Sequence, residues 1–65
     1  MWGLFTDTDD GLRISVDLDH IINVMELPDG TTGLWMETNS KNLSAHVKES
    51  FDEVMRAIAA NEGQI

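Results

Sequence analysis

The sequence contains no cysteine, so neither a disulfide bond nor a thiolate-bound zinc ion can stabilise the fold. It has a single proline and no tyrosine, and no apolar run approaches the roughly 20 residues of a membrane-spanning helix. The 65 residues predict one domain, residues 1–65, near the lower size limit for a single apolar core. A small domain without covalent cross-links often gains stability by oligomerising, so these absences favour a homo-oligomer.

Basic residues are scarce as well. Four lysines and arginines stand against twelve aspartates and glutamates, which gives a formal net charge of -8. Direct binding to nucleic acid or to an anionic membrane is therefore not expected, because both depend on basic side chains that neutralise phosphate. The charge is compatible with a basic protein partner, and its simplest role is to keep a small domain soluble. The amino-terminal residues form no basic and apolar signal segment, so we expect a cytoplasmic protein.

Two kinds of periodicity divide the chain. Pro28–Gly30 predicts the tight turn of a central hairpin, because proline presets φ and glycine permits a positive φ. After residue 50 the apolar spacing changes to 3.6 residues, which predicts an amphipathic helix at about residues 51–61. The order predicts an α+β fold: an antiparallel meander sheet of four or five strands with one C-terminal helix packed on it. Alternating apolar and polar residues predict the strands at about residues 2–6, 12–16, 21–27, 31–38 and 43–47.

The predicted helix carries its own start and stop signals. Ser50 is a natural N-cap, and Glu53 three residues later completes the pattern of a capping box. Gly63 is a candidate C-terminal stop. The predicted apolar face of the helix consists of Phe51, Val54, Met55 and Ile58.

The central hairpin has apolar residues on both faces. Strict alternation places Ile22 and Val24 on an inner face with Leu34 and Met36. The opposite face then carries more apolar side chains than one helix can cover, and a monomer rarely exposes such a patch unless it binds something. Tryptophan is also enriched at interaction hot spots. We therefore predict an interface on this face, most simply with another copy of the chain, formed by Ile21, Met25, Leu27 and Trp35, with Phe5 beside them.

Two segments carry a recognisable pattern: Val16–Ile22, "VDLDHII", and Val47–Ile58, "VKESFDEVMRAI". They resemble the small flagellar and swarming-motility proteins of bacteria. Those proteins share an alternating strand, a turn similar to "LNPDLI", a hairpin and an ending close to "V-x-E-S-x-E-E-V-x-x-I". The resemblance, seen also in small phage proteins, implies this fold and a bacterial or phage origin. The aspartate-rich first turn, Trp2 and Trp35 depart from the family pattern. The residues in register in the ending are Val47, Glu49, Ser50, Glu53, Val54 and Ile58.

Three aspartates, Asp7, Asp9 and Asp10, precede Gly11 in the segment "TDTDDG". The segment does not match an EF-hand loop, because the glycine comes one residue early and Leu18 stands where the closing glutamate is needed. A hairpin turn with Gly11 at a positive φ accounts for the same residues, with a weak calcium or magnesium contact as the alternative. We assign to the three aspartates a candidate role in steering a basic partner.

Catalytic constellations are missing from the sequence. His20 and His46 match no metal-ligand spacing, so we expect a structural role for both. Ser44 and His46 lie on one face of a predicted strand, but no acid is obviously placed to orient the imidazole. A chain this small also has little room for a substrate pocket. We expect no enzymatic activity, no cofactor and no metal.

The sequence supports three functional hypotheses. The favoured one is a non-catalytic, homo-oligomeric binding protein that occupies the surface of a partner protein, for example a phage-encoded inhibitor of a host defence protein. The second is a sponge that sequesters a small nucleotide signal at a subunit boundary, where Trp35 would stack on the ligand and Lys41 and Lys48 would supply positive charge. The third, which follows from the resemblance, is an accessory protein of the flagellar system.

Overall fold

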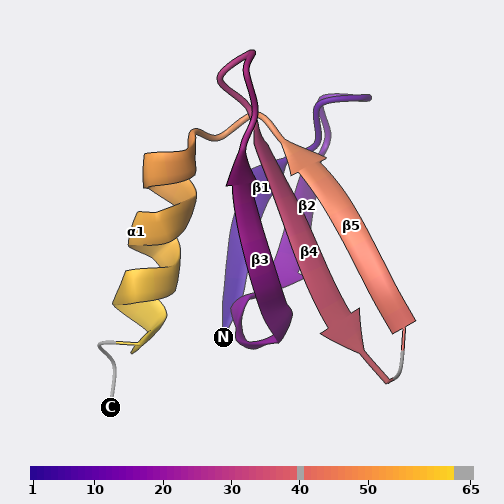
Figure 1. Ribbon diagram of the computed structural model, residues 1–65, viewed down its shortest axis with the longest axis vertical. Helices are drawn as coiled ribbons and strands as arrows, with labels where there is room; N and C mark the ends of the chain where they lie inside the picture. The colour runs from indigo at the N-terminus through magenta and orange to yellow at the C-terminus, as the bar shows by residue number, and fades with distance from the viewer. Residues whose placement is uncertain (40, 63–65) are drawn as a thin grey trace.

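The chain folds into five antiparallel strands, one short 3-10 turn and one C-terminal helix (Figure 1). The computed structural model describes residues 1–39 and 41–62. The predicted α+β class is confirmed; Gly63, the predicted stop of the helix, lies outside the described residues. The elements are β1 (Trp2–Thr6), β2 (Arg13–Asp17), η1 (Leu18–His20), β3 (Ile21–Glu26), β4 (Thr32–Thr38), β5 (Lys41–Val47) and α1 (Phe51–Glu62).

The strands form two sheets rather than one continuous meander. β1 pairs with β2, whereas β3, β4 and β5 form a three-stranded sheet in chain order. Figure 1 shows the β1–β2 pair behind the three-stranded sheet and α1 beside β3. A bridge between Asp7 and Val47 links the sheets, and next to it the Thr8 N–H donates to the His46 carbonyl at 3.0 Å. The β1–β2 pair thus covers a part of the larger sheet that the helix does not reach.

The core lies between the two sheets and the helix. Six apolar residues are buried, one each from β1, β2, η1, β4, β5 and α1, and β3 adds partly buried side chains at the margin. Burial of one such side chain contributes about 1.5–3 kcal/mol, so no element can be removed without a large loss of stability. Among the described residues, the buried apolar side chains of the core are Phe5, Val16, Leu18, Leu34, Val47 and Val54.

A β-bulge between Ile21 and Asn23 decides which side chains of β3 face the core. Ile21 pairs with Met36 and packs against the core, whereas Ile22 is 62% exposed. The predictions that Ile22 faces inward and that Ile21 faces outward are therefore wrong. The extra residue of a bulge reverses the alternation on one side of it, and no strict period of two can anticipate that. Val24, beyond the bulge, packs against the core as predicted.

Phe5 also lies elsewhere than predicted. It is buried in the core, because β1 packs across the larger sheet instead of extending its outer face. Its neighbours in the strand, Trp2 and Leu4, point the other way and are each 66% exposed. The β1–β2 pair therefore has one face in the core and exposes Trp2 and Leu4 on the other, where the register places Asp17 and Ser15 beside them.

The acidic segment forms the turn between β1 and β2, as predicted. The Gly11 N–H donates to the Asp7 carbonyl, and Gly11 has a φ of 71°, in the region that favours glycine. The Asp7 carboxylate accepts from the Asp9 N–H, and the Asp10 carboxylate accepts from the Leu12 N–H. Such side-chain bonds to a nearby backbone amide stabilise turns, so two of the three aspartates have a local structural role.

The segment between β5 and α1 holds three parts of the fold together. The Glu49 carboxylate accepts two hydrogen bonds from Thr6, from its backbone N–H at 2.8 Å and from its hydroxyl at 3.0 Å. The Glu49 carbonyl accepts from the hydroxyl of Thr32, a fully buried residue, at 2.7 Å. Glu49 therefore joins the end of β1 to the start of β4, and it lies two residues before the start of α1.

The helix begins where the sequence predicts it. The Ser50 hydroxyl oxygen accepts from the Glu53 N–H, and the Ser50 O–H donates to the Glu53 carboxylate, both at 3.2 Å. Val54 is fully buried and Ile58 packs against the core, but Met55, predicted on the same face, is 39% exposed. Among the described residues, no helix has both the length and the hydrophobicity to span a bilayer.

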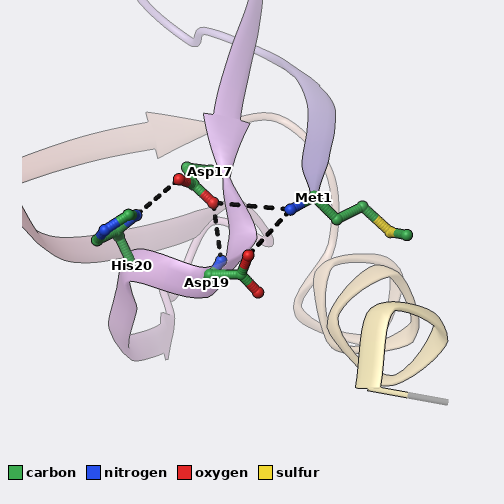
Figure 2. A network of polar contacts seen from close by, with 4 residues as sticks. All are labelled: Met1, Asp17, Asp19 and His20. Carbon is green, nitrogen blue, oxygen red and sulfur yellow. Dashed lines mark hydrogen bonds and ion pairs between the residues drawn. The ribbon is translucent and has the colours of Figure 1, made fainter. Parts of the chain in front are cut away.

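A polar network fixes the passage from β2 to β3 (Figure 2). One carboxylate oxygen of Asp17 accepts from the Asp19 N–H at 3.1 Å, and the other lies 2.7 Å from the Nδ1 of His20. The amino-terminal ammonium of Met1 donates to Asp19 at 3.0 Å, and this hydrogen bond raises the pKa of the ammonium. His20 is thus held by Asp17 at the end of the core away from the acidic turn.

The contacts of Glu49 predict a pH-dependent loss of stability in a Glu49→Gln variant. Partial desolvation acts to raise the pKa of the Glu49 carboxyl, but the hydrogen bonds from Thr6, together with the Glu49 backbone N–H and the charge of Lys48, outweigh it and hold that pKa below its ordinary value of 4.5. A lowered pKa stabilises the fold above the ordinary value, and this contribution disappears as the pH falls through the folded-state pKa. We expect the variant to lose about 1 kcal/mol of unfolding free energy near neutral pH, measured by urea denaturation.

The matched control is Glu37→Gln, which removes the same charge from an exposed residue of β4. Its unfolding free energy should stay within about 0.5 kcal/mol of the wild type. In acid, well below the ordinary carboxyl pKa, the Glu49→Gln deficit should shrink toward zero. A deficit of equal size in acid would show that shape, and not the ionised carboxylate, matters at this position.

Candidate functional site

The candidate site lies on the outer face of the three-stranded sheet, which points away from the core. A hollow of about 330 Å3 opens on this face. The register of the strands places two rows of residues there, Met25–Gly33–His46 and Asn23–Trp35–Ser44. The hollow is lined by Asp7, Asp9, Leu27, Gly33, Trp35, Ser44, Ala45 and His46.

The indole of Trp35 forms part of this surface because it lies over the backbone of Gly33. A Cβ atom at position 33 would lie 3.0 Å from the Cζ3 of Trp35. Gly33 is accordingly buried although it lies on the outer face, whereas Trp35 remains 39% exposed. Trp35 therefore presents an aromatic surface to solvent at the side of the hollow.

The acidic turn supplies the charged side of the hollow. The hydrogen bond from the Thr8 N–H to the His46 carbonyl places the turn against the end of β5. The carboxylate of Asp7 is held by the Asp9 N–H at 2.7 Å, so its position is fixed locally. Asp7 and Asp9 line the hollow, whereas Asp10, the third aspartate predicted to steer a partner, does not.

A chain of hydrogen bonds orients His46 at the same place. The Thr31 hydroxyl donates to the Asp29 carboxylate, and the oxygen of that hydroxyl contacts the Nε2 of His46. Because the hydroxyl has one proton, the Thr31 oxygen accepts from a protonated Nε2. The bond from the Thr31 hydroxyl also lowers the pKa of the Asp29 carboxyl. The chain leaves Nδ1 as an acceptor in the neutral imidazole, so His46 can add a polar contact to the hollow.

Three of the four residues predicted to form an interface lie on this face. Leu27 and Trp35 line the hollow, and Met25, 44% exposed, lies in the adjoining row. Ile21 does not belong to this surface, because the bulge turns it toward the core. Whether the surface is an interface stays a prediction.

The sequence placed Ser44 and His46 on one face of a predicted strand, but neither was predicted to belong to a binding site. Their signal was the alternation in "LSAHV", which separates them from the apolar Leu43 and Ala45. Their position beside the acidic turn was not visible, because it depends on the pairing of Thr8 with His46.

The two lysines assigned to an anionic ligand are far from each other. Lys41 begins β5 and Lys48 follows its end, so about 20 Å of extended strand separate them. Neither lines the hollow, and the Lys48 Nζ would lie 3.8 Å from a Cβ at Gly11, on the acidic turn. Within one protomer, Trp35 is bordered by carboxylates and not by lysines.

The polar residues of the hollow do not form a metal site. In the part of the chain that the structure describes, no group of three or more histidine, aspartate or glutamate side chains is arranged to hold a metal ion. Asp7, Asp9 and His46 therefore share one hollow without converging on one point. Their arrangement suits a larger cationic group that can contact them separately.

Comparison with known proteins finds no matching family model, no matching curated protein and no matching solved structure. The resemblance to small flagellar and swarming-motility proteins stays a prediction.

The contact between Gly33 and Trp35 predicts that Gly33→Ala displaces the indole. Position 33 does not have a positive φ, so alanine is tolerated by the backbone, but its Cβ would press on the ring at 3.0 Å. In a Trp2→Phe background, which leaves Trp35 as the only tryptophan, we expect the fluorescence emission to shift to longer wavelength. Far-UV circular dichroism should not change.

A second substitution in the same background, Asp52→Asn, serves as control because it lies at an exposed position of α1, away from the outer sheet face. It should leave the emission unchanged. An unshifted spectrum in the Gly33→Ala variant would mean that the indole does not rest on the glycine backbone.

Proposed function

We propose that this protein is a non-catalytic binding protein that captures a basic segment of a partner protein in the hollow on its outer sheet face. One observation supports the proposal: an exposed indole, apolar side chains and two carboxylates border the same hollow. These groups come from the sheet, from the acidic turn and from the hairpin turn.

The hollow matches the two parts of an arginine or lysine side chain. The apolar stem of such a side chain would contact Leu27 and Trp35, and its cation would meet Asp7 and Asp9. A cation over an indole face contributes about 0.5–1 kcal/mol at an exposed site. The net charge of -8 adds long-range attraction that accelerates the encounter with a basic partner.

Binding of this kind acts by covering a surface, so it needs no chemistry of its own. A phage-encoded inhibitor of a host defence protein is one concrete form of the proposal, since an inhibitor only has to occupy a basic site of its target. A flagellar accessory protein would use the same surface to hold a component of its assembly.

A nucleotide sponge receives less support from the geometry. The phosphate of a nucleotide stacked on Trp35 would face Asp7 and Asp9 and be repelled by both. Neither Lys41 nor Lys48 lines the hollow of its own protomer, so neither is placed to offset that repulsion.

The proposal is tested by titrating the protein with a hexa-arginine peptide and following amide and indole resonances by NMR. We expect the largest shifts at the Trp35 indole, Ser44 and His46. Trp35→Ala should weaken the affinity by about tenfold or more, because it removes the aromatic contact and part of the apolar wall. Asp9→Asn should weaken it less and should also reduce its dependence on salt.

Asp52→Asn is the matched control, because it removes the same charge from an exposed position on α1. It should leave the affinity close to that of the wild type. Shifts spread evenly over all acidic residues, with equal losses for Asp9→Asn and Asp52→Asn, would show non-specific attraction and contradict the proposal. Release of a nucleotide from the heated, purified protein would instead favour the sponge.

A further inference from the structure

β5 has a free edge along most of its length. One side of β5 pairs with β4, and the other meets the β1–β2 pair only at its end, where the His46 carbonyl accepts from the Thr8 N–H. Backbone groups of alternate residues in a strand point to the same side. The backbone groups of His46 point away from β4, so those of Asn42 and Ser44 point away from β4 too. No strand among the described residues pairs with this side of Asn42 and Ser44.

An apolar cleft opens beside this free edge. The two sheets separate from the bridge at Asp7 and Val47, and a cleft of about 290 Å3 lies between them. Leu43 of β5 and Trp2 of β1 border it, and they are 48% and 66% exposed. The edge thus combines unpaired backbone groups with apolar side chains that are exposed to solvent. This combination favours the addition of another strand.

The charges on the edge strands indicate through which edge two copies of the chain can pair. Of the strands with an unpaired side, β2 carries Asp17 and β3 carries Glu26, whereas β1 and β5 contain no carboxylate, and of these two only β5 carries a basic residue, Lys41. Two copies of a protein with a net charge of -8 repel each other, and a contact through β5 adds no carboxylate pair to that repulsion. Figure 1 shows that β5 also lies at the side of the molecule opposite α1, where the helix cannot obstruct a second copy.

We propose that two copies of the chain pair through β5, antiparallel to each other, about a two-fold axis that passes beside Leu43. Asn42 then lies opposite the partner's Ser44, and each such pair exchanges both of its N–H···O bonds. Leu43 faces the partner's Leu43 in a non-hydrogen-bonded pair, where Cα atoms lie about 4.5 Å apart and side chains touch. An axis at Ser44 would instead bring Asn42 against the partner's His46, whose carbonyl is already bonded to Thr8.

The pairing joins the two three-stranded sheets into one sheet of six strands. Its axis is perpendicular to the sheet, so both outer faces lie on the same side. The dimer therefore presents two Trp35 hollows in one direction, and it covers the Leu43 side of both apolar clefts. A partner with two basic segments could occupy both hollows and gain avidity without any new contact.

The proposal is tested by sedimentation equilibrium of the wild type and of two variants. We expect the wild type to be a dimer. Ser44→Pro removes an outward N–H without touching the bonds to β4, and should weaken dimerisation by about tenfold or more. Leu43→Arg keeps the backbone groups but sets two cations against each other, and should give a monomer. Ser44→Ala, which leaves the backbone intact, should remain a dimer.

Amide hydrogen exchange distinguishes a dimer contact at this edge from a contact elsewhere. Its measurement on the wild type does not require that any variant folds. In the dimeric wild type the amides of Asn42 and Ser44 should exchange slowly, and in the Leu43→Arg monomer they should exchange as fast as those of exposed turns. A wild type that sediments as a monomer would overturn the proposal. A dimer in which these two amides exchange freely, or which survives Leu43→Arg, would place the contact elsewhere and overturn it too.

Discussion

The attachment of Thr6 to Glu49 is the constraint on which the rest of the structure depends. Those two hydrogen bonds hold the end of β1 against the junction of β5 and α1, and the Thr32 hydroxyl holds the start of β4 at the same residue. Without this junction the β1–β2 pair would keep only its short bridge to β5 and its packing on the core. In a domain with so small a core and no covalent cross-link, a few polar bonds decide whether the second sheet stays in place.

The local sequence pattern predicted the strands and the helix, whereas the predictions that failed depend on long-range pairing and packing. The change from a period of two to one of 3.6 predicted strands followed by a helix, and Ser50 and Gly11 marked a helix start and a turn because each acts within a few residues. The bulge at Ile22 left no such mark, so Ile21 was assigned to the wrong face. Phe5 was misplaced for another reason: nothing local indicates that β1 crosses the larger sheet.

The candidate site, too, was only partly predictable from the sequence. Trp35 and Leu27 were identifiable as apolar residues beyond the reach of one helix, and the aspartates were identifiable by their charge. That they border one hollow could not be predicted, because the bond between Thr8 and His46 joins distant parts of the chain. The Asp29–Thr31–His46 chain was hidden likewise, since Thr31 and His46 meet only when β4 and β5 pair. A surface of this kind emerges from the register of the sheet.

The distance along the chain between Thr6 and Glu49, 43 residues, has a consequence for synthesis on the ribosome. The β1–β2 hairpin emerges first and makes local contacts, so it can form early, but its docking site does not exist until β5 and Glu49 have been made. Until then the apolar side chains of Phe5 and Val16 have no core to pack against. The apolar face of this hairpin therefore stays uncovered until the segment around Glu49 is in place, so the two sheets can associate only late in folding.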